Sequence, residues 1–337
     1  MQWIEAQEVY ARLPRLTAIA CVRRALEEER RTAAASAPRV GVDAAALRLL
    51  LMPGRMSGVV GLKAITFAEQ NPQRGLPTIQ GLVVLFDGLS GQLIGACDGP
   101  SLTAVRTAAI AGYATSQLAA LGAQTMLLAG AGAQAAFQVA AVEAVRPISR
   151  VLLWNRTPEK AEALARRLAT WNSEISYQAV ADLPAASRQA DVITLVTGAS
   201  EPLLRLEDTK PGCHVNAMGS YHPDRREVAS DFVKAAMVFA DTVAGCAEEA
   251  GDLLIPLATG ELEWSRVHPL LDANPDFQAE RTLLKSVGSS IFDLACAATL
   301  FGLLSELSNP SELGNQAEPD WPVETPTRTE HPNPAAG

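Results

Sequence analysis

Residues 125–157, TMLLAGAGAQAAFQVAAVEAVRPISRVLLWNRT, carry the pattern that decides the fold of this chain. They read as an apolar strand, a glycine turn, an apolar helix and a second strand. Gly130 permits a tight turn after the first strand, Gly132 lets a ligand approach the backbone, and Ala135 lets the helix pack close to the sheet. The spacing predicts a dinucleotide site, although GAGAQA alone also fits a close contact of a small-residue helix.

The residues after the second strand indicate which dinucleotide this unit prefers. The amides of Ala133 and Gln134, at the helix N-terminus, would hold the diphosphate. An NAD site usually places an acidic residue on the ribose about 20 positions further on. This chain has Asn155, Arg156 and Thr157 there, and all three can donate hydrogen bonds to a 2′-phosphate that a carboxylate would repel. We therefore predict NADPH as the cofactor, with NADH as a weaker alternative.

Composition sets the class of protein. At 337 residues the chain is long for one hydrophobic core, so two domains are expected. With 48% hydrophobic and 19% charged residues it is globular, and a net charge of −9 argues against nucleic acid or an anionic membrane as the main partner. The five scattered cysteines suit a reducing compartment and no metal cluster is visible. Without a leader-like or membrane-length apolar segment, we expect a soluble cytoplasmic protein.

The order of elements divides the chain. Residues 1–112 mix a leading helix with hairpin signals, which predicts a mostly antiparallel sheet. Residues 113–289 alternate strands and helices, which is typical of a doubly wound parallel sheet in an α/β fold. The segment 286–307 reads as a long apolar helix that returns to the first domain or makes a subunit contact, so residues 290–311 are grouped with 1–112. Residues 312–337 are polar and proline-rich, and we expect a disordered tail. The expected strands are 58–67, 78–86, 92–98, 125–129, 150–155, 192–197, 214–219 and 237–240.

Six motifs occur together in one known family. They are GLKAITF (61–67), DGPSLTAVRTAA (98–109), GAGAQA (130–135), WNRTPEKAEALA (154–165), KPGCHVNAMGSYHPDRREV (210–228) and KSVGSSIFDLA (285–295). With these motifs, the chain resembles the ornithine cyclodeaminase/mu-crystallin family over roughly residues 1–310. The resemblance implies a homodimer, in which a Rossmann-type domain is inserted in an α+β substrate-binding and dimerisation domain. It also implies a nicotinamide cofactor and a small α-amino or α-imino acid as substrate.

Two cations are the predicted catalytic residues. Lys63 lies in the apolar run 59–67, where it is either a strand-edge lysine with its head in water or a charge directed into the cleft. In the cleft it would bind a carboxylate, and a lowered pKa would make it a proton donor. Arg106 lies in a helix of small residues and needs an anionic partner. That partner is an internal carboxylate or, as the resemblance implies, the cofactor and substrate.

Further site residues follow from the resemblance. The arginine that corresponds to Arg39 binds the substrate carboxylate in family members, although the short motif around Arg39 also fits a surface arginine. Thr78 aligns with a polar residue near the nicotinamide. Thr197, Met218 and Gly219, at the ends of two expected strands, complete the predicted cofactor contacts.

Tyr221, which we assign to the substrate site, separates two activities within the family. Cyclodeaminating members carry an aspartate there, and a tyrosine with a pKa of about 10 cannot replace that base at neutral pH. Ketimine reductases of the mu-crystallin kind also lack the aspartate and share the WNRT ending. Neither His222 nor Asp293 is predicted to be catalytic; Asp293 is interpreted as a helix cap, an arginine partner or a contact of the site.

The leading hypothesis is an NADPH-dependent oxidoreductase that reduces the C=N bond of cyclic ketimines in proline metabolism. Its substrates would be Δ1-pyrroline-2-carboxylate, Δ1-piperideine-2-carboxylate or both, giving L-proline and L-pipecolate. The alternatives are an ornithine cyclodeaminase or an enzyme like alanine dehydrogenase, and an NADPH-dependent ligand-binding protein of the mu-crystallin type.

Overall fold

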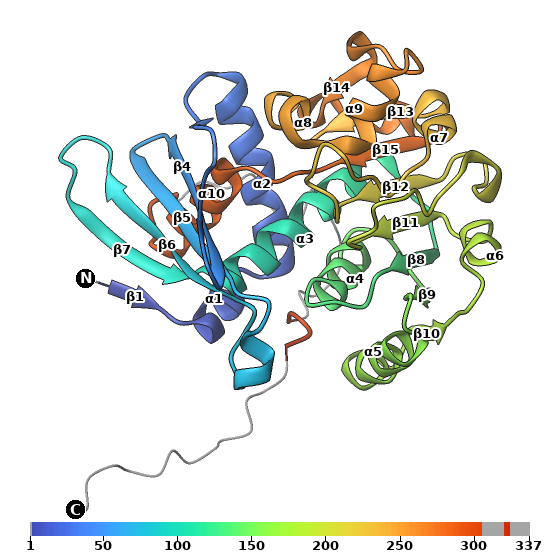
Figure 1. Ribbon diagram of the computed structural model, residues 1–337, viewed down its shortest axis with the longest axis horizontal. Coiled ribbons are helices and arrows are strands. Elements are labelled where there is room, and N and C mark those ends of the chain that lie inside the picture. Colours follow the sequence, from blue (N-terminus) through green and yellow to red (C-terminus); the bar gives the residue numbers. More distant parts are fainter. Residues whose placement is uncertain (1, 305–319, 324–337) are drawn as a thin grey trace, which may run out of the picture.

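The computed structural model describes residues 2–304 and 320–323, which form two β-sheets joined by a long helix (Figure 1). One sheet is mixed and the other is entirely parallel. Helix α3 (Gly99–Leu118) leads from the first sheet to the second. Within the described residues, no helix is both long and apolar enough to cross a membrane.

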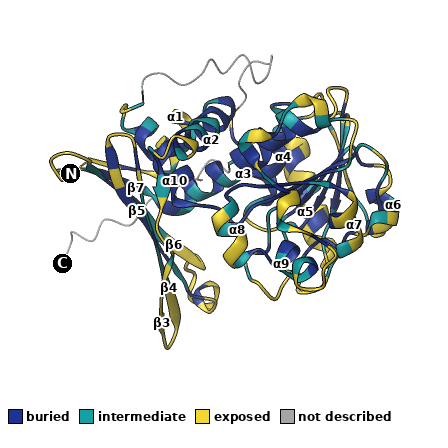
Figure 2. Cartoon of the chain, turned by 90° about the horizontal axis from the view of Figure 1, so that it is seen from above, coloured by how far each residue is buried: buried dark blue, intermediate teal, exposed yellow. Residues whose placement is uncertain are grey.

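The first sheet has the order β1-β7-β6-β5-β4-β2, and β3 pairs with β4. Only β1 runs parallel to its neighbour, so the sheet is mostly antiparallel as predicted. Its strands are β1 (Gln2–Ile4), β2 (Ala35–Ser36), β3 (Val40–Ala44), β4 (Leu47–Met56), β5 (Val59–Phe67), β6 (Ile79–Asp87) and β7 (Leu93–Asp98). Strand β4 was not predicted. Figure 2 shows that the outer end of β3 and β4 is exposed, away from the helices.

Helices α1 (Ala6–Arg12) and α10 (Ser290–Leu300) pack against this sheet, as does α3, and α2 (Arg15–Arg30) packs on α3 and α10. Where the sequence predicted one leading helix, the structure has the short strand β1 and the two helices α1 and α2. Pro14 separates the helices, because proline cannot continue α1 and instead caps the N-terminus of α2. Helix α10 returns to the first sheet and lies across β4, β5 and β6. It ends at Leu300, earlier than predicted, and residues 305–307 of the expected helix lie outside the described residues.

The second sheet has the order β10-β9-β8-β11-β12-β15-β13-β14, with every pair parallel. The chain moves outward from β8 to β10 and then returns to β11 on the other side of β8. In open α/β sheets such a reversal marks the ligand-binding crevice, at the carboxyl ends of the strands. This confirms the predicted Rossmann-type α/β fold. The strands are β8 (Thr125–Ala129), β9 (Arg150–Trp154), β10 (Ser176–Ala179), β11 (Val192–Leu195), β12 (His214–Ala217), β13 (Met237–Ala240), β14 (Val267–Pro269) and β15 (Thr282–Lys285).

Helices cover both faces of this parallel sheet, so its strands are apolar on both sides. In β8, Met126 and Leu128 pack in one apolar cluster, whereas Leu127 and Ala129 pack in another. The helices are α4 (Ala135–Glu143), α5 (Pro158–Trp171), α6 (Leu183–Ser187), α7 (Ser230–Ala235), α8 (Val243–Glu249) and α9 (Gly251–Ala258). Short 3₁₀ turns are η1 (Asn71–Arg74), η2 (Leu206–Asp208), η3 (Trp264–Arg266), η4 (Leu270–Asp272) and η5 (Pro275–Phe277).

Helix α3 belongs to both halves of the molecule. Its N-terminus is capped by Asp98, which accepts a hydrogen bond from the amide of Ser101 at 2.8 Å. The helix packs against α2, α4 and β12, and it runs without a break through residue 112, where we expected the domain boundary.

The expectation of a disordered tail over 312–337 is wrong at residues 320–323. Trp321 is only 2% exposed, and its indole N–H donates a hydrogen bond to the Leu13 carbonyl at 2.7 Å. Its ring packs against Phe137 of α4. The composition of the segment did not indicate burial, because the partner residues come from distant helices. The other tail residues, 312–319 and 324–337, lie outside the described residues.

Candidate active site

The glycine turn after β8 leaves room for a diphosphate. Gly130 has a φ of +107°, and a Cβ there would lie 2.6 Å from the Val196 carbonyl oxygen, so only glycine suits this position. A Cβ on Gly132 would meet no atom within 4 Å, so its backbone faces open space. Ala133 and Gln134 follow directly, and α4 begins at Ala135. The turn thus has the geometry that a dinucleotide requires.

The loop after β9 lies against this turn. Asn155 Oδ1 accepts a hydrogen bond from the Ala131 amide at 3.0 Å, and Asn155 Nδ2 donates one to the Thr157 carbonyl at 2.9 Å. The Asn155 side chain therefore connects the loop with the turn. Arg156 and Thr157, the next two residues, are exposed.

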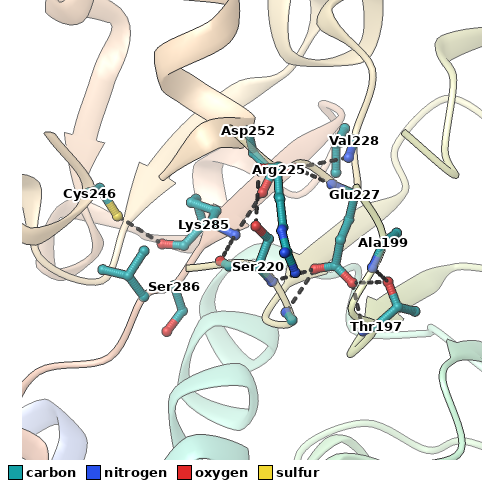
Figure 3. A network of polar contacts seen from close by, with 12 residues as sticks. Thr197, Ala199, Ser220, Arg225, Glu227, Val228, Cys246, Asp252, Lys285 and Ser286 are labelled. Atoms are coloured by element: carbon teal, nitrogen blue, oxygen red, sulfur yellow. Dashed lines mark hydrogen bonds and ion pairs between the residues drawn. The ribbon is translucent and has the colours of Figure 1, made fainter. Parts of the chain in front are cut away.

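One buried carboxylate joins the loops after β11 and β12 (Figure 3). Glu227 Oε1 accepts hydrogen bonds from the amide and the hydroxyl of Thr197, both at 2.7 Å, and Oε2 accepts from the Gly219 amide at 2.7 Å. A Cβ on Gly219 would lie 2.2 Å from the Thr197 carbonyl oxygen, so glycine permits this approach. Thr197, Met218 and Gly219 thus lie at the carboxyl ends of neighbouring strands, next to the crevice.

Behind these loops, Lys285 of β15 forms a fully buried ion pair with Asp252 (Figure 3). Lys285 Nζ lies 2.7 Å from Asp252 Oδ2 and donates to the Ser220 carbonyl at 2.7 Å. Asp252 Oδ1 accepts from the amides of Glu227 and Val228. Burial alone would lower the pKa of Lys285, but the carboxylates of Asp252 and Glu227 outweigh it and raise that pKa. Sequence reasoning quoted Glu227 and Lys285 only as parts of motifs and did not predict this network.

Lys63, Arg106 and Asp293 form the second charged cluster. Lys63, near the middle of β5, is 1% exposed, and its Nζ lies 3.0 Å from Asp293 Oδ2. Arg106 Nε of α3 lies 3.0 Å from Asp293 Oδ1. The Lys63 ammonium group is therefore buried and does not lie in solvent. The anionic partner of Arg106 is an internal carboxylate. Asp293 was not predicted to be catalytic, although it is the one acidic residue in the apolar helix α10.

The environment of Lys63 changes its acidity. Burial lowers its pKa, as does the nearby positive charge of Arg106, whereas Asp293 raises it; the result is a pKa of about 8. Arg39 adds a smaller lowering effect. A lysine with this pKa can release a proton far more readily than one in water.

Arg39 and Arg106 both contact the loop between β15 and α10. Arg39 Nη2 donates to the carbonyls of Val287 and Gly288, both at 2.6 Å, and lies 3.1 Å from Glu249 Oε2. Gly288 has a φ of +75°, and a Cβ on it would lie 2.5 Å from Arg106 Nη1. The loop thus holds both guanidinium groups close to Lys63.

A cavity of about 660 Å³ opens beside Arg39. Its lining includes Tyr221, His222 and Glu249, together with residues of the β3–β4 hairpin. The Tyr221 ring stacks on the His222 ring with centroids 4.6 Å apart. Thr78 is exposed in the loop before β6 and is not among the described residues that line this cavity.

The chain is similar to known proteins over most of its length. A sequence model of the ornithine cyclodeaminase/mu-crystallin family matches residues 4–306. A Δ1-pyrroline-2-carboxylate reductase of Bacillus cereus is 36% identical over 262 residues, or 75% of this chain and 80% of that protein. The ketimine reductase mu-crystallin of Rattus norvegicus is 34% identical over 239 residues, or 71% of this chain and 74% of that protein. The solved Δ1-pyrroline-2-carboxylate reductase of Thermococcus litoralis, in complex with NADH and L-proline, has a TM-score of 0.84 at 25% identity and covers 94% of this chain and 100% of its own.

Proposed function

The chain belongs to the ornithine cyclodeaminase/mu-crystallin family, and we propose that it is an NADPH-dependent reductase of cyclic ketimines. Its substrate is Δ1-pyrroline-2-carboxylate, Δ1-piperideine-2-carboxylate or both, and its products are accordingly L-proline, L-pipecolate or both. It acts in the cytoplasm as a homodimer, and NADH serves as a weaker cofactor. The observation that carries the proposal is the buried Lys63, which Asp293 holds beside Arg106.

The glycine turn fits the cofactor diphosphate, because the backbone at Gly132 faces open space and the amides of Ala133 and Gln134, just before α4, supply donors. Arg156 and Thr157 hold the 2′-phosphate, while Asn155 keeps their loop against the turn. Thr197, Met218 and Gly219 line the nicotinamide end of the crevice. A bound reduced nicotinamide supplies the hydride.

The cations of the first domain bind and polarise the substrate. Arg39 and Lys63 hold the ring carboxylate, and Arg106 fixes the orientation of the ring. With a pKa of about 8, Lys63 is mostly protonated at neutral pH and donates a proton to the imine nitrogen. The protonated imine carries a positive charge and accepts hydride more readily. Asp293 keeps Lys63 and Arg106 in place, which is a positioning role.

Tyr221 supports reduction over cyclodeamination. It lines the cavity beside Arg39 at the position where cyclodeaminating members carry an aspartate. A neutral phenol cannot take up the proton of a substrate amine as that carboxylate would. Glu249 lines the same cavity, but it is paired with Arg39 and is therefore not an unengaged base.

The size of the cavity favours one second candidate. About 660 Å³ exceeds what a five- or six-membered ring needs and is typical of sites for drug-sized ligands. A protein that binds NADPH and a larger ligand, without turnover, is therefore the alternative function.

The deciding experiment follows NADPH and NADH oxidation by absorbance with each of the two cyclic imines. Rapid loss of NADPH with either imine supports the reductase, and the ratio of the two rates ranks the rings. Ammonia release from L-ornithine with NAD would support a cyclodeaminase instead. Tight NADPH binding without oxidation by either imine would favour the binding protein.

A further inference from the structure

The segment 320–323 lies between the two halves of the molecule. Figure 1 shows it as a short red stretch between α1 and α4. Trp321 is one of the largest fully buried side chains among the described residues. Its indole N–H donates to the carbonyl of Leu13, the residue that ends α1, at 2.7 Å. Helix ends leave carbonyls without intrahelical partners, so this bond satisfies both groups.

An aromatic cluster joins Trp321 to the helix of the glycine turn. The Trp321 and Phe137 rings lie 5.6 Å apart, and the Phe137 and Tyr10 rings lie 5.7 Å apart. Phe137 belongs to the first turn of α4, whereas Tyr10 belongs to α1. Trp321 therefore contacts the first turn of the helix that follows directly on Ala133 and Gln134, whose amides form the proposed diphosphate site.

The clasp contact lies outside the part of the chain that the family model covers. The family model matches residues 4–306 and ends before Trp321. The glycine turn and the Lys63 cluster lie within the matched range, whereas Trp321 lies beyond it. A buried tryptophan nevertheless contributes a large apolar contact area.

We propose that residues 320–323 form a clasp that docks between α1 and α4 and holds the first turn of α4 in position for the cofactor. Trp321 contacts Leu13 and Phe137, and Tyr10 packs on Phe137. Docking of the clasp depends only on these contacts, whereas its effect on the cofactor rests on the proposed function. Loss of the clasp frees the first turn of α4 and weakens NADPH binding.

Trp321→Ala in the full chain tests the clasp. We expect its Kd for NADPH to rise about fivefold or more, in the range typical of coupled sites. Trp321→Phe keeps a ring beside Phe137 but removes the indole N–H, so its Kd should lie between those of the wild type and Trp321→Ala. Trp3→Ala, at the more exposed tryptophan of β1, is the matched control and should keep the wild-type Kd.

Acrylamide quenching of tryptophan fluorescence in the wild type and in Trp321→Phe measures docking separately. The fluorescence that the wild type has and Trp321→Phe lacks belongs to Trp321. If acrylamide does not quench this fluorescence, docking is supported. If acrylamide quenches it freely, docking is overturned. An unchanged NADPH Kd in Trp321→Ala overturns the coupling alone. A wild type that binds neither NADPH nor NADH overturns the coupling together with the proposed function.

Discussion

Lys63 Nζ lies 3.0 Å from Asp293 Oδ2, although the two residues are 230 positions apart in the sequence and both side chains are buried. Burial and the charge of Arg106 favour the neutral amine, whereas the carboxylate favours the ammonium form. The balance leaves a pKa of about 8, at which Lys63 can both hold a carboxylate and give up a proton at neutral pH. Asp293 therefore controls the charge of the proposed proton donor.

Asp293→Asn should move the alkaline limit of imine reduction to lower pH. Protonated Lys63 is the active form, so kcat/KM falls as the pH rises through its pKa, at about 8 in the wild type. Because Asp293 raises that pKa, its removal lowers it, and the fall begins earlier. Profiles of kcat/KM between about pH 6 and pH 10 measure the shift.

Asp208→Asn, which breaks a distant pair with Arg188, is the control for that profile. The imine itself titrates identically in both assays, so a difference between the two variants belongs to the protein. If the alkaline limit of Asp293→Asn coincides with that of the wild type, Lys63 is not the group that sets it.

Lys63→Met should reduce turnover and spare cofactor binding. The substitution removes the proposed proton donor but retains a side chain of similar length, and Asp293 keeps its partner Arg106. We expect kcat/KM for imine reduction to fall by about 10²- to 10⁴-fold, the usual contribution of general acid catalysis. The NADPH Kd should stay close to that of the wild type in a fluorescence titration.

Lys160→Met, at an exposed position of α5, is the matched control for the loss of one lysine. A kcat/KM in Lys63→Met equal to that of the control would remove Lys63 from the mechanism.

The parts of the fold that depend on local spacing could be predicted from the sequence. The strand 125–129 and the turn at Gly130 follow from the order of apolar and glycine residues, and the structure contains both. Short strands such as β15 were missed, because its four residues, Thr-Leu-Leu-Lys, are too few to distinguish a strand from a piece of helix. Local pattern therefore predicted the parallel sheet but not its full set of strands.

The contacts that complete the site join distant segments, and for these the sequence offers no local signal. Arg106 and Asp293 are 187 positions apart, and Trp321 and Leu13 are 308 positions apart. The need of Arg106 for an anion could be predicted from the cost of burying it alone. Which carboxylate meets that need depends on how α10 packs against β5 and α3, so it appears only in the folded chain.

Lys285→Met should strongly destabilise the protein. It leaves the buried carboxylates of Asp252 and Glu227 without their cation, and an uncompensated buried charge typically costs about 3–5 kcal/mol. The midpoint of urea unfolding, with and without NADPH, measures the loss.

Lys210→Met is the matched control, because its pair with Asp191 is partly exposed and should contribute less than about 1 kcal/mol. Equal shifts of the midpoint in the two variants would mean that the buried network does not stabilise the loops after β11 and β12.

Arg156→Ala should change the choice between the two cofactors. Arg156 is exposed at the end of β9, and Asn155 holds its loop against the glycine turn through the Ala131 amide. A hydrogen-bonded guanidinium contributes more to a phosphate than to a ribose hydroxyl. We therefore expect the NADPH Kd to rise about tenfold, equivalent to about 1.4 kcal/mol, and the NADH Kd to stay unchanged.

Arg150→Ala, at the opposite end of the same strand, is the control and should leave both Kd values unchanged. Equal weakening of NADPH and NADH in Arg156→Ala would show that Arg156 does not recognise the 2′-phosphate.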